Sequence, residues 1–352
     1  MRKLVGLIAA VLVAAATAAL PLMLNRSGTT VYILVGLYAI VAIGISLLMG
    51  YAGQVSIGQV AFYGIGAYTT AFLAISGWPP LVGLLLAPVV SYACAWLIGV
   101  PLLRLRGHYL AFGTLALLLI LNAVISQIAF LGKATGLQGI PPLQVGEFVF
   151  NRPIYYAWVT WFSVIVVAVL SRNIIQSRPG RALRALATSE VAATSSGVPV
   201  MAYRRNIFAL SGAFAGLAGG IYSLFIGFIS PASFTVQLSL QFVVIAVVGG
   251  LGTVWGPVIG AALVTLVLQI LNAAGTLPGM PAELPAIMNY AAYALLLIGT
   301  ILLLPRGIYP SIRDLFRRML GTRSPNPAPA LDTPESNHLD PNPVQDAPIK
   351  VP

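Results

Sequence analysis

Long apolar blocks alternate with short polar or charged segments along most of the chain. Most blocks are long enough to cross the hydrocarbon core of a bilayer, which takes about 20 helical residues. Runs such as 110–121 and 286–304 show no alternation of apolar and polar positions, which favours helices over barrel strands. The pattern predicts an all-α, polytopic transmembrane helix bundle of about ten spans, at 4–24, 30–49, 59–77, 80–101, 109–131, 154–171, 206–228, 238–250, 257–274 and 286–304.

Composition supports a membrane protein. Of the 352 residues, 59% are hydrophobic and 8% are charged, whereas a soluble domain carries about 25% charged residues. The single cysteine, Cys94, lies within an apolar block, so the sequence predicts no disulfide framework and a buried role for this residue. His108 and His338 have no acidic or cysteine partners at ligand spacing, so no metal site is predicted.

The positive charges lie at the ends of apolar blocks. This distribution argues against a nucleic-acid partner, despite the formal net charge of +11. If the N-terminus is cytoplasmic, the cytoplasmic segments hold sixteen of the nineteen Lys and Arg residues, and Arg26, Lys133 and Arg152 fall outside them. The positive-inside rule therefore predicts that both termini are cytoplasmic, and an odd number of spans would break this agreement.

The two ends of the chain differ from the centre. Arg2, Lys3, an apolar stretch and small residues at 16–18 resemble a cleavable signal peptide, but the apolar stretch continues to Leu24, which favours a retained span. Residues 321–352 hold eight of the 25 prolines and few large apolar side chains, which is typical of disorder. A tolerated extension is favoured over a docking role for this tail. The predicted organisation is a transmembrane domain, 1–310, with a cytoplasmic loop at 172–205, followed by a basic juxtamembrane segment and disordered Pro-rich cytoplasmic tail, 311–352.

The sequence carries no pattern typical of an enzyme. It contains no nucleophile–base pair, carboxylate dyad or glycine-rich phosphate loop. Glu147, Glu190 and Glu283 all fall in predicted loops, and no carboxylate lies within a predicted span. Proton-coupled carriers usually need an ionisable group at membrane depth. The energy for transport is therefore expected from another source, or the protein is passive.

A first glycine-rich segment, 50–59, combines closely spaced glycines with neutral polar side chains. Glycines at this density let the backbone leave helical geometry and approach another chain or a solute. Broken helices at membrane depth usually line a cavity, while close helix packing explains the same composition equally well. The candidate residues of a translocation path here are Gly50, Gly53, Gln54, Ser56, Gly58 and Gln59.

A second glycine-rich segment occupies 249–260, and the predicted span at 206–228 also carries glycines four residues apart. Small residues at this interval let two helices pack closely, and here packing is favoured over direct solute contact. The further path candidates are Gly249, Gly250, Gly252 and Gly256, and the candidates for helix packing are Gly212, Gly216, Gly220 and Gly260.

The cytoplasmic loop contains a predicted surface helix. Ser189 is a suitable N-cap, Glu190 suits the positive end of a helix, and Gly197 can terminate it. These residues predict a helix of about two turns preceded by a basic helical stretch. Docking to a cytoplasmic partner is favoured over a simple amphipathic surface helix, because a plain connector needs no such ordered elements.

Together these three segments resemble the permeases of branched-chain amino-acid ABC importers, specifically the longer of their two membrane subunits. The similarity covers roughly residues 30–310, and the order and spacing of the matching blocks make it specific. Further blocks that resemble this family lie at 103–112, 136–142, 228–234 and 304–307.

The resemblance implies a multi-pass protein of the bacterial inner membrane that is a transport subunit and not an enzyme. The implied partners are a second homologous permease subunit, two cytoplasmic ATPase subunits, an extracytoplasmic solute-binding protein and membrane lipid. No cofactor is expected on this chain, since ATP binds the partner subunits. The 180–197 loop would be the coupling helix that lies in a groove of the ATPase. Its candidate coupling residues are Arg181, Arg184, Glu190, Ala192, Ala193 and Gly197.

The expected activity is ATP-driven import of branched-chain or related amino acids by alternating access. Urea and amide importers share most of these motifs, so they are an alternative substrate class. An ATP-independent channel or facilitator is a second alternative, although it would need no ATPase-docking loop. Two departures from the family pattern are Gln59, where many relatives carry histidine, and the uncharged residues 187–189, where relatives often carry charges.

Overall fold

A computed structural model describes residues 17, 19–105, 107–275, 284–304 and 307–312. The predictions for the first span, 4–24, and for the 321–352 tail therefore lie wholly or largely outside the described residues. The described elements are mostly helical. The helices are α2 (Arg26–Ala52), α3 (Gln59–Ile75), α4 (Pro80–Leu102), α5 (His108–Gln127), α6 (Pro153–Gln176), α7 (Arg178–Thr188), α8 (Glu190–Ser195), α9 (Val200–Ile226), α10 (Val236–Gly249), α11 (Gly256–Gly275) and α12 (Leu284–Leu303).

Short irregular elements depart from an all-helical chain. Three 3-10 helices, η1 (Ala129–Leu131), η2 (Lys133–Thr135) and η3 (Pro231–Ser233), lie in the described connections. Strand β1 (Leu137–Gln138) pairs antiparallel with β4 (Phe228–Ile229), and β2 (Gln144–Val145) pairs with β3 (Phe148–Val149). These pairings satisfy backbone groups of the loops between α5 and α6 and after α9.

Seven helical segments of the described chain are long and apolar enough to cross a bilayer. One of them, Pro231–Gly249, consists of η3 and α10 together. Two further apolar helices, Gln59–Ile75 and Ile287–Thr300, are shorter. The third predicted span, 59–77, corresponds to α3, which begins at Gln59 as predicted and ends two residues earlier than predicted, at Ile75. The predicted span at 206–228 begins earlier than expected, at Val200, and so carries two arginines in its first turns.

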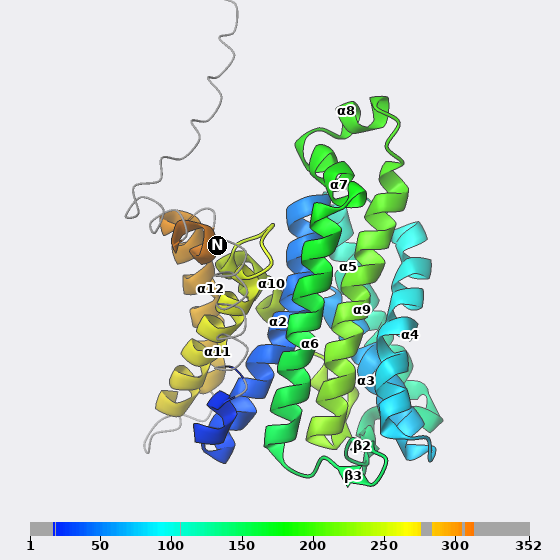
Figure 1. The fold of residues 1–352 in the computed structure, drawn as a ribbon, viewed down its shortest axis with the longest axis vertical. Coiled ribbons are helices and arrows are strands. Elements are labelled where there is room, and N and C mark those ends of the chain that lie inside the picture. The colour runs from blue at the N-terminus through cyan, green and yellow to red at the C-terminus, as the bar shows by residue number, and fades with distance from the viewer. Residues whose placement is uncertain (1–16, 18, 106, 276–283, 305–306, 313–352) are drawn as a thin grey trace, which may run out of the picture. The chain divides into compact units, whose positions relative to one another are not determined.

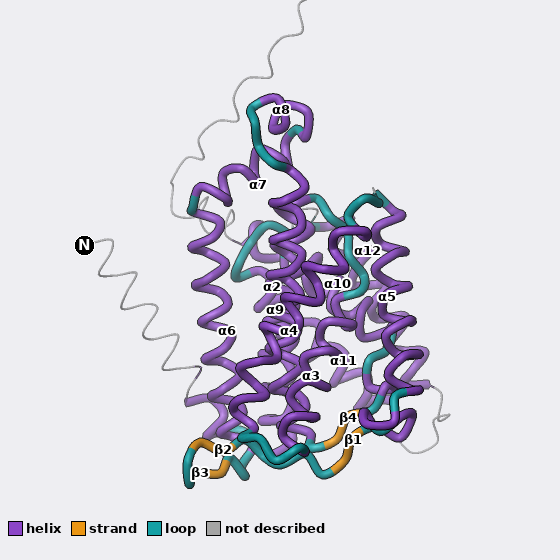
Figure 2. Tube along the Cα trace, turned by 90° about the vertical axis from the view of Figure 1, so that its right-hand side faces the viewer, coloured by secondary structure: helices purple, strands orange, loops and turns teal. Residues whose placement is uncertain are grey.

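The bundle has two distinct ends (Figure 1). All four strands lie at one end, where α6 begins and α9 finishes; we call this the strand end. Helices α7 and α8 connect the other ends of α6 and α9, and they project beyond the bundle (Figure 2). The loop with the predicted coupling residues and the block at 136–142 therefore lie at opposite ends of the bundle.

Helices α2 and α9 form the interior. In each of these two helices, 78% of the most apolar 18-residue stretch is buried inside the protein. The corresponding share is 28% in α4 and in α5, which lie at the periphery. A helix that is apolar on all sides is expected to be buried or to face lipid. Small residues allow close approach in α9: a Cβ atom on Gly216 would overlap Ser91 of α4, and one on Gly219 would overlap the carbonyl oxygen of Tyr63 in α3.

Candidate functional site

Helix α7 is amphipathic. Leu183 and Leu186 are buried, while Arg181 and Arg184 are exposed. The guanidinium of Arg184 donates a hydrogen bond to the carbonyl oxygen of Ile175 at 2.5 Å, so it satisfies a free carbonyl at the end of α6. One of the two predicted coupling arginines thus also fixes the junction between α6 and α7.

Helix α8 follows after a single extended residue, Ser189. It ends at Ser195, and Gly197 then adopts φ +77°, a left-handed conformation that glycine accepts without strain. Ala192 belongs to this helix. Ala193 is buried, and it forms a small apolar cluster with Leu186 of α7 and Val200 of α9. The cluster holds α7, α8 and the start of α9 together.

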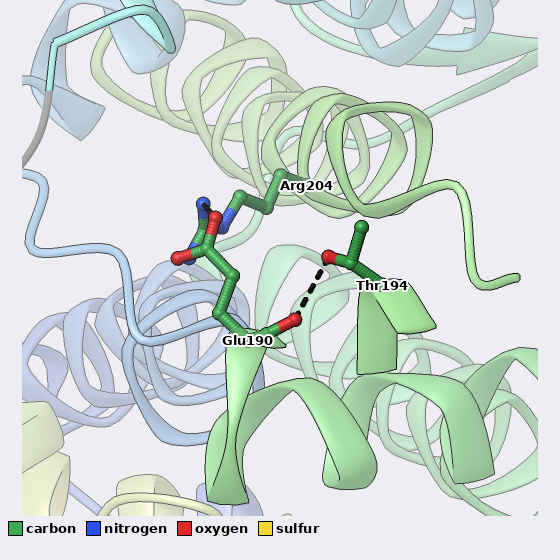
Figure 3. Close-up of polar contacts among 3 residues, drawn as sticks. All are labelled: Glu190, Thr194 and Arg204. Atoms are coloured by element: carbon green, nitrogen blue, oxygen red, sulfur yellow. Dashed lines mark hydrogen bonds and ion pairs between the residues drawn. The ribbon is translucent and has the colours of Figure 1, made fainter. Parts of the chain in front are cut away.

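Glu190 forms an ion pair within the chain (Figure 3). Both of its carboxylate oxygens accept hydrogen bonds from the guanidinium of Arg204, at 3.0 and 3.1 Å. The Thr194 hydroxyl donates to the Glu190 carbonyl oxygen at 2.8 Å, one turn further along α8. A bidentate arginine–carboxylate pair has a defined orientation, so Glu190 fixes α8 against the first turns of α9.

The outward surface of α8 is partly apolar. Val191 is 77% exposed at this end of the bundle. Thr194, Ser195 and Gly197 are also exposed.

A cavity of about 140 Å³ connects α8 to the first glycine-rich segment. It is lined by Gly53 and Gln54 from that segment and by Glu190 and Arg204 from the ion pair. Leu103, Leu105, Gly107 and Leu110, from the block at 103–112, complete its wall. Three sequence blocks that lie far apart in the chain therefore meet at one place.

The two glycine-rich segments pack directly against each other. A Cβ atom on Gly50 would overlap the backbone of Gly252. The Tyr51 hydroxyl donates to the Gly252 carbonyl oxygen at 2.8 Å, and the Ser46 hydroxyl donates to the Thr253 carbonyl oxygen at 2.9 Å. The end of α2 is thus hydrogen-bonded to the loop between α10 and α11 and packs closely against it.

Other predicted glycines also lie at close backbone contacts. Gly249 packs against Gly256, and Gly260 packs against the carbonyl oxygen of Ile245. Gly250 has φ +115° at the end of α10. Gly212 packs against Ala95 and Phe62, and Gly220 packs against Thr70 and Ala87.

Residues 53–58 form a non-helical segment between α2 and α3. Gln54, Ser56 and Gln59 are buried. The Ile57 amide donates to the Thr114 hydroxyl at 3.0 Å, and the Ser239 hydroxyl donates to the Ile57 carbonyl oxygen. A Cβ atom on Gly58 would overlap the Thr114 carbonyl oxygen. Side chains of α5 and α10 therefore satisfy a backbone that has left helical geometry, as such a segment requires in an apolar setting.

The family of branched-chain amino acid transport system permease components matches residues 27–304. The chain belongs to this family. It is a permease component of a branched-chain amino acid transport system, a multi-pass membrane protein of a bacterial ABC transporter family. The resemblance inferred from the sequence blocks is thereby confirmed. As a transport component it has no catalytic role of its own.

Several curated permeases are similar to the chain. The high-affinity branched-chain amino acid transport system permease protein LivM of Salmonella typhimurium is 28% identical over 86% of this chain and 74% of its own length. The LivH protein of Escherichia coli is 26% identical over 77% of this chain and 90% of its own length. The nucleoside ABC transporter permease protein NupC of Lactococcus lactis is 24% identical over 73% of this chain and 86% of its own length. No solved structure matches the chain.

Sequence reasoning missed two residues of the α8 region. The sequence places Arg204 among the cytoplasmic cations and does not reveal that it is the partner of Glu190. Val191, an exposed apolar residue of α8, is not among the predicted coupling residues. The sequence does not indicate this ion pair, because a turn at 196–199 separates Glu190 from Arg204. The two residues are therefore not neighbours on one helix, where a spacing of three or four residues would have suggested a pair.

Proposed function

We propose that this branched-chain amino acid transport permease is the LivM-type subunit of an ABC importer that moves branched-chain or related amino acids into the cytoplasm. Its proposed partners are a second, homologous permease subunit, two ATPase subunits that bind and hydrolyse ATP, and an extracytoplasmic binding protein. The observation that carries the proposal is the ordered α7–α8 element, which projects from one end of a chain of this family.

The α7–α8 end is proposed to face the cytoplasm. Arg172, Arg178, Arg181, Arg184 and Arg204 lie at or near this end. At the strand end the described basic residues are Arg26, Lys133 and Arg152. This asymmetry supports the positive-inside orientation. With a retained span at 4–24, it also supports ten crossings and two cytoplasmic termini.

The ATPase surface is proposed to comprise α7 and α8. Arg181 supplies a charge, and Val191 supplies an exposed apolar contact. Ala192 and Gly197 belong to the same element, and the small side chain of Ala193 permits its packing against Leu186. The ion pair between Glu190 and Arg204 would pass a displacement of α8 directly to α9.

The proposed route into the membrane begins at the cavity beside this ion pair. Gln54 and Gly53 line that cavity, and their segment continues to Ser56, Gly58 and Gln59 inside the bundle. The close packing of Gly50 on Gly252, with the hydrogen bond from Tyr51, links this segment to the loop between α10 and α11. Movement of α8 would therefore shift both glycine-rich segments, and we propose that these segments border the translocation path.

Substitution of Val191 tests the docking surface. Val191→Asp is expected to reduce co-purification of the ATPase subunits with the detergent-solubilised complex, because it places a charge in an apolar contact. Val145→Asp is the matched control, since Val145 is 48% exposed at the strand end. Equal ATPase recovery from both variants would contradict the proposal. Retained ATP-independent uptake in membranes without the ATPase subunits would instead indicate the channel alternative.

A further inference from the structure

A second cavity, of about 360 Å³, lies among six helices in the apolar bundle. None of the predicted path residues lines it. Its volume falls at the lower end of the range for small-molecule sites, which is about 300–1,000 Å³. Representative lining side chains, one from each helix, are Tyr38, Tyr63, Tyr222, Gln241, Thr265 and Asn289.

The lining is polar but uncharged. Twelve of the fifteen lining side chains carry a hydroxyl or amide group, and the other three are leucines. The larger cavity between α4, α8 and α9 differs, since Arg104, Glu190 and Arg205 line it. Neutral donors and acceptors beside an apolar wall suit a small solute without net charge that carries an aliphatic part.

Three buried polar atoms of this lining have no hydrogen-bond partner: the hydroxyl oxygens of Tyr63 and Thr265 and the amide oxygen of Asn289. Tyr63 is 1% exposed and Thr265 is 7% exposed. Buried polar groups are nearly always paired in folded proteins. Three such atoms lie on the wall of this one cavity, where a polar ligand can pair with them.

Neighbouring contacts hold the unpaired groups in place. The Tyr63 ring packs against the rings of Tyr222 and Phe242, at centroid distances of 5.6 and 5.7 Å. The Asn289 side-chain nitrogen donates to the side-chain oxygen of Asn272 at 3.0 Å, which fixes the Asn289 amide and leaves its oxygen free to accept. Groups fixed in this way are preorganised for a ligand.

The cavity lies mainly in the half of the bundle near the strand end. Tyr38 is in the first half of α2, Asn289 is in the first turns of α12, and Tyr222 is near the end of α9. Ser233 and Thr235, from the irregular segment between α9 and α10, also line it. Interrupted backbone inside a membrane bundle commonly lines a solute site.

We infer that this cavity is a solute-binding site of the permease itself, for a net-neutral amino acid with an aliphatic side chain. Hydroxyl and amide oxygens accept from the ammonium group, amide and phenol donors pair with the carboxylate, and the leucines contact the aliphatic part. This inference rests on the proposed import function. It also places a selectivity step in this chain, in addition to the selectivity of a separate binding protein.

Two hydroxyl deletions test the site in the complete complex, reconstituted with its binding protein. Tyr63→Phe and Thr265→Val each remove one unpaired hydroxyl from the cavity. Tyr68→Phe and Thr160→Val are matched controls, because their hydroxyls are also buried and unpaired but lie outside it. The cavity variants are expected to lower the rate of ATP-driven leucine uptake about two- to tenfold each, as the loss of one hydrogen bond predicts, while the control variants keep the wild-type rate. Uptake by the cavity variants that matches the controls would overturn the inference.

A labelling measurement tests binding independently of transport. Cys94 is the single cysteine, so Gln237→Cys in a Cys94→Ser background introduces one thiol into the cavity wall. Leucine is expected to slow its alkylation in the complete complex, and lysine is not. Alkylation unaffected by leucine would overturn the inference, whatever the uptake result. Failure of the wild-type complex to import leucine with ATP, in contrast, would count against the proposed function.

Discussion

Removal of the ion pair between Glu190 and Arg204 should weaken attachment of the ATPase subunits, because the pair fixes α8 on α9. The two hydrogen bonds measure 3.0 and 3.1 Å, and the side chains are 42% and 18% exposed. Partly exposed pairs contribute about 0.2–1 kcal/mol, and bidentate geometry favours the upper part of that range. A loss of about 1 kcal/mol corresponds to about fivefold weaker ATPase binding.

The assay is a double-substitution cycle with Glu190→Gln, Arg204→Gln and the combined variant. ATPase binding to the purified permease complex is measured by titration, and ATP-driven leucine uptake is measured in parallel. Each single substitution is expected to cost about fivefold in binding, and the combined variant should cost little more, because the same interaction is lost once. Glu147→Gln, an exposed carboxylate at the strand end, is the control.

A charge exchange separates this role from a direct contact with the ATPase. Glu190→Arg alone places two guanidinium groups together and should reduce binding more than Glu190→Gln. The exchanged variant, Glu190→Arg with Arg204→Glu, should recover part of the loss. Independent, additive costs in the cycle and no recovery on exchange would refute the reasoning that Glu190 acts through Arg204.

Two further predictions concern packing. Gly219→Ala would place a methyl group on the Tyr63 carbonyl oxygen. We expect this variant to lose about 1–3 kcal/mol of stability, measured by thermal unfolding of the detergent-solubilised chain. The control Gly299→Ala has open space around the new methyl group and should lose no stability. Tyr51→Phe removes the 2.8 Å hydrogen bond to Gly252 and should lower stability by about 0.5–1.5 kcal/mol. Faster amide hydrogen exchange in the 250–256 loop would support this prediction, and unchanged exchange would contradict it.

Much of the bundle follows from local sequence. Long apolar blocks must satisfy their backbone hydrogen bonds within themselves in a membrane, so the helices from α2 to α12 were predictable to within a few residues at most ends. The start of α9 was not, because its first turns are basic and lie outside the apolar pattern. The short strand pairs were also missed, since each involves only two residues on a strand.

The candidate site was only partly predictable. Composition located the glycine-rich segments, but it could not say that Gly50 lies against Gly252, since that contact depends on how α2 and the α10–α11 loop meet. The polar cavity gave no sequence signal at all. Its residues are single hydroxyl and amide side chains, such as Tyr38, Thr265 and Asn289, distributed over separate apolar helices.

The most direct test of the proposed coupling role of α7 and α8 is a cross-link between α8 and an ATPase subunit. Val191→Cys in the Cys94→Ser background gives one exposed thiol on α8, and Val145→Cys in the same background gives one at the strand end. With a short thiol-to-amine cross-linker in membranes that contain the whole importer, the α8 thiol should join to the ATPase and the strand-end thiol should not. Cross-linking to the ATPase from the strand end, or none from α8, would contradict the claim that ATP hydrolysis acts on this permease through α7 and α8.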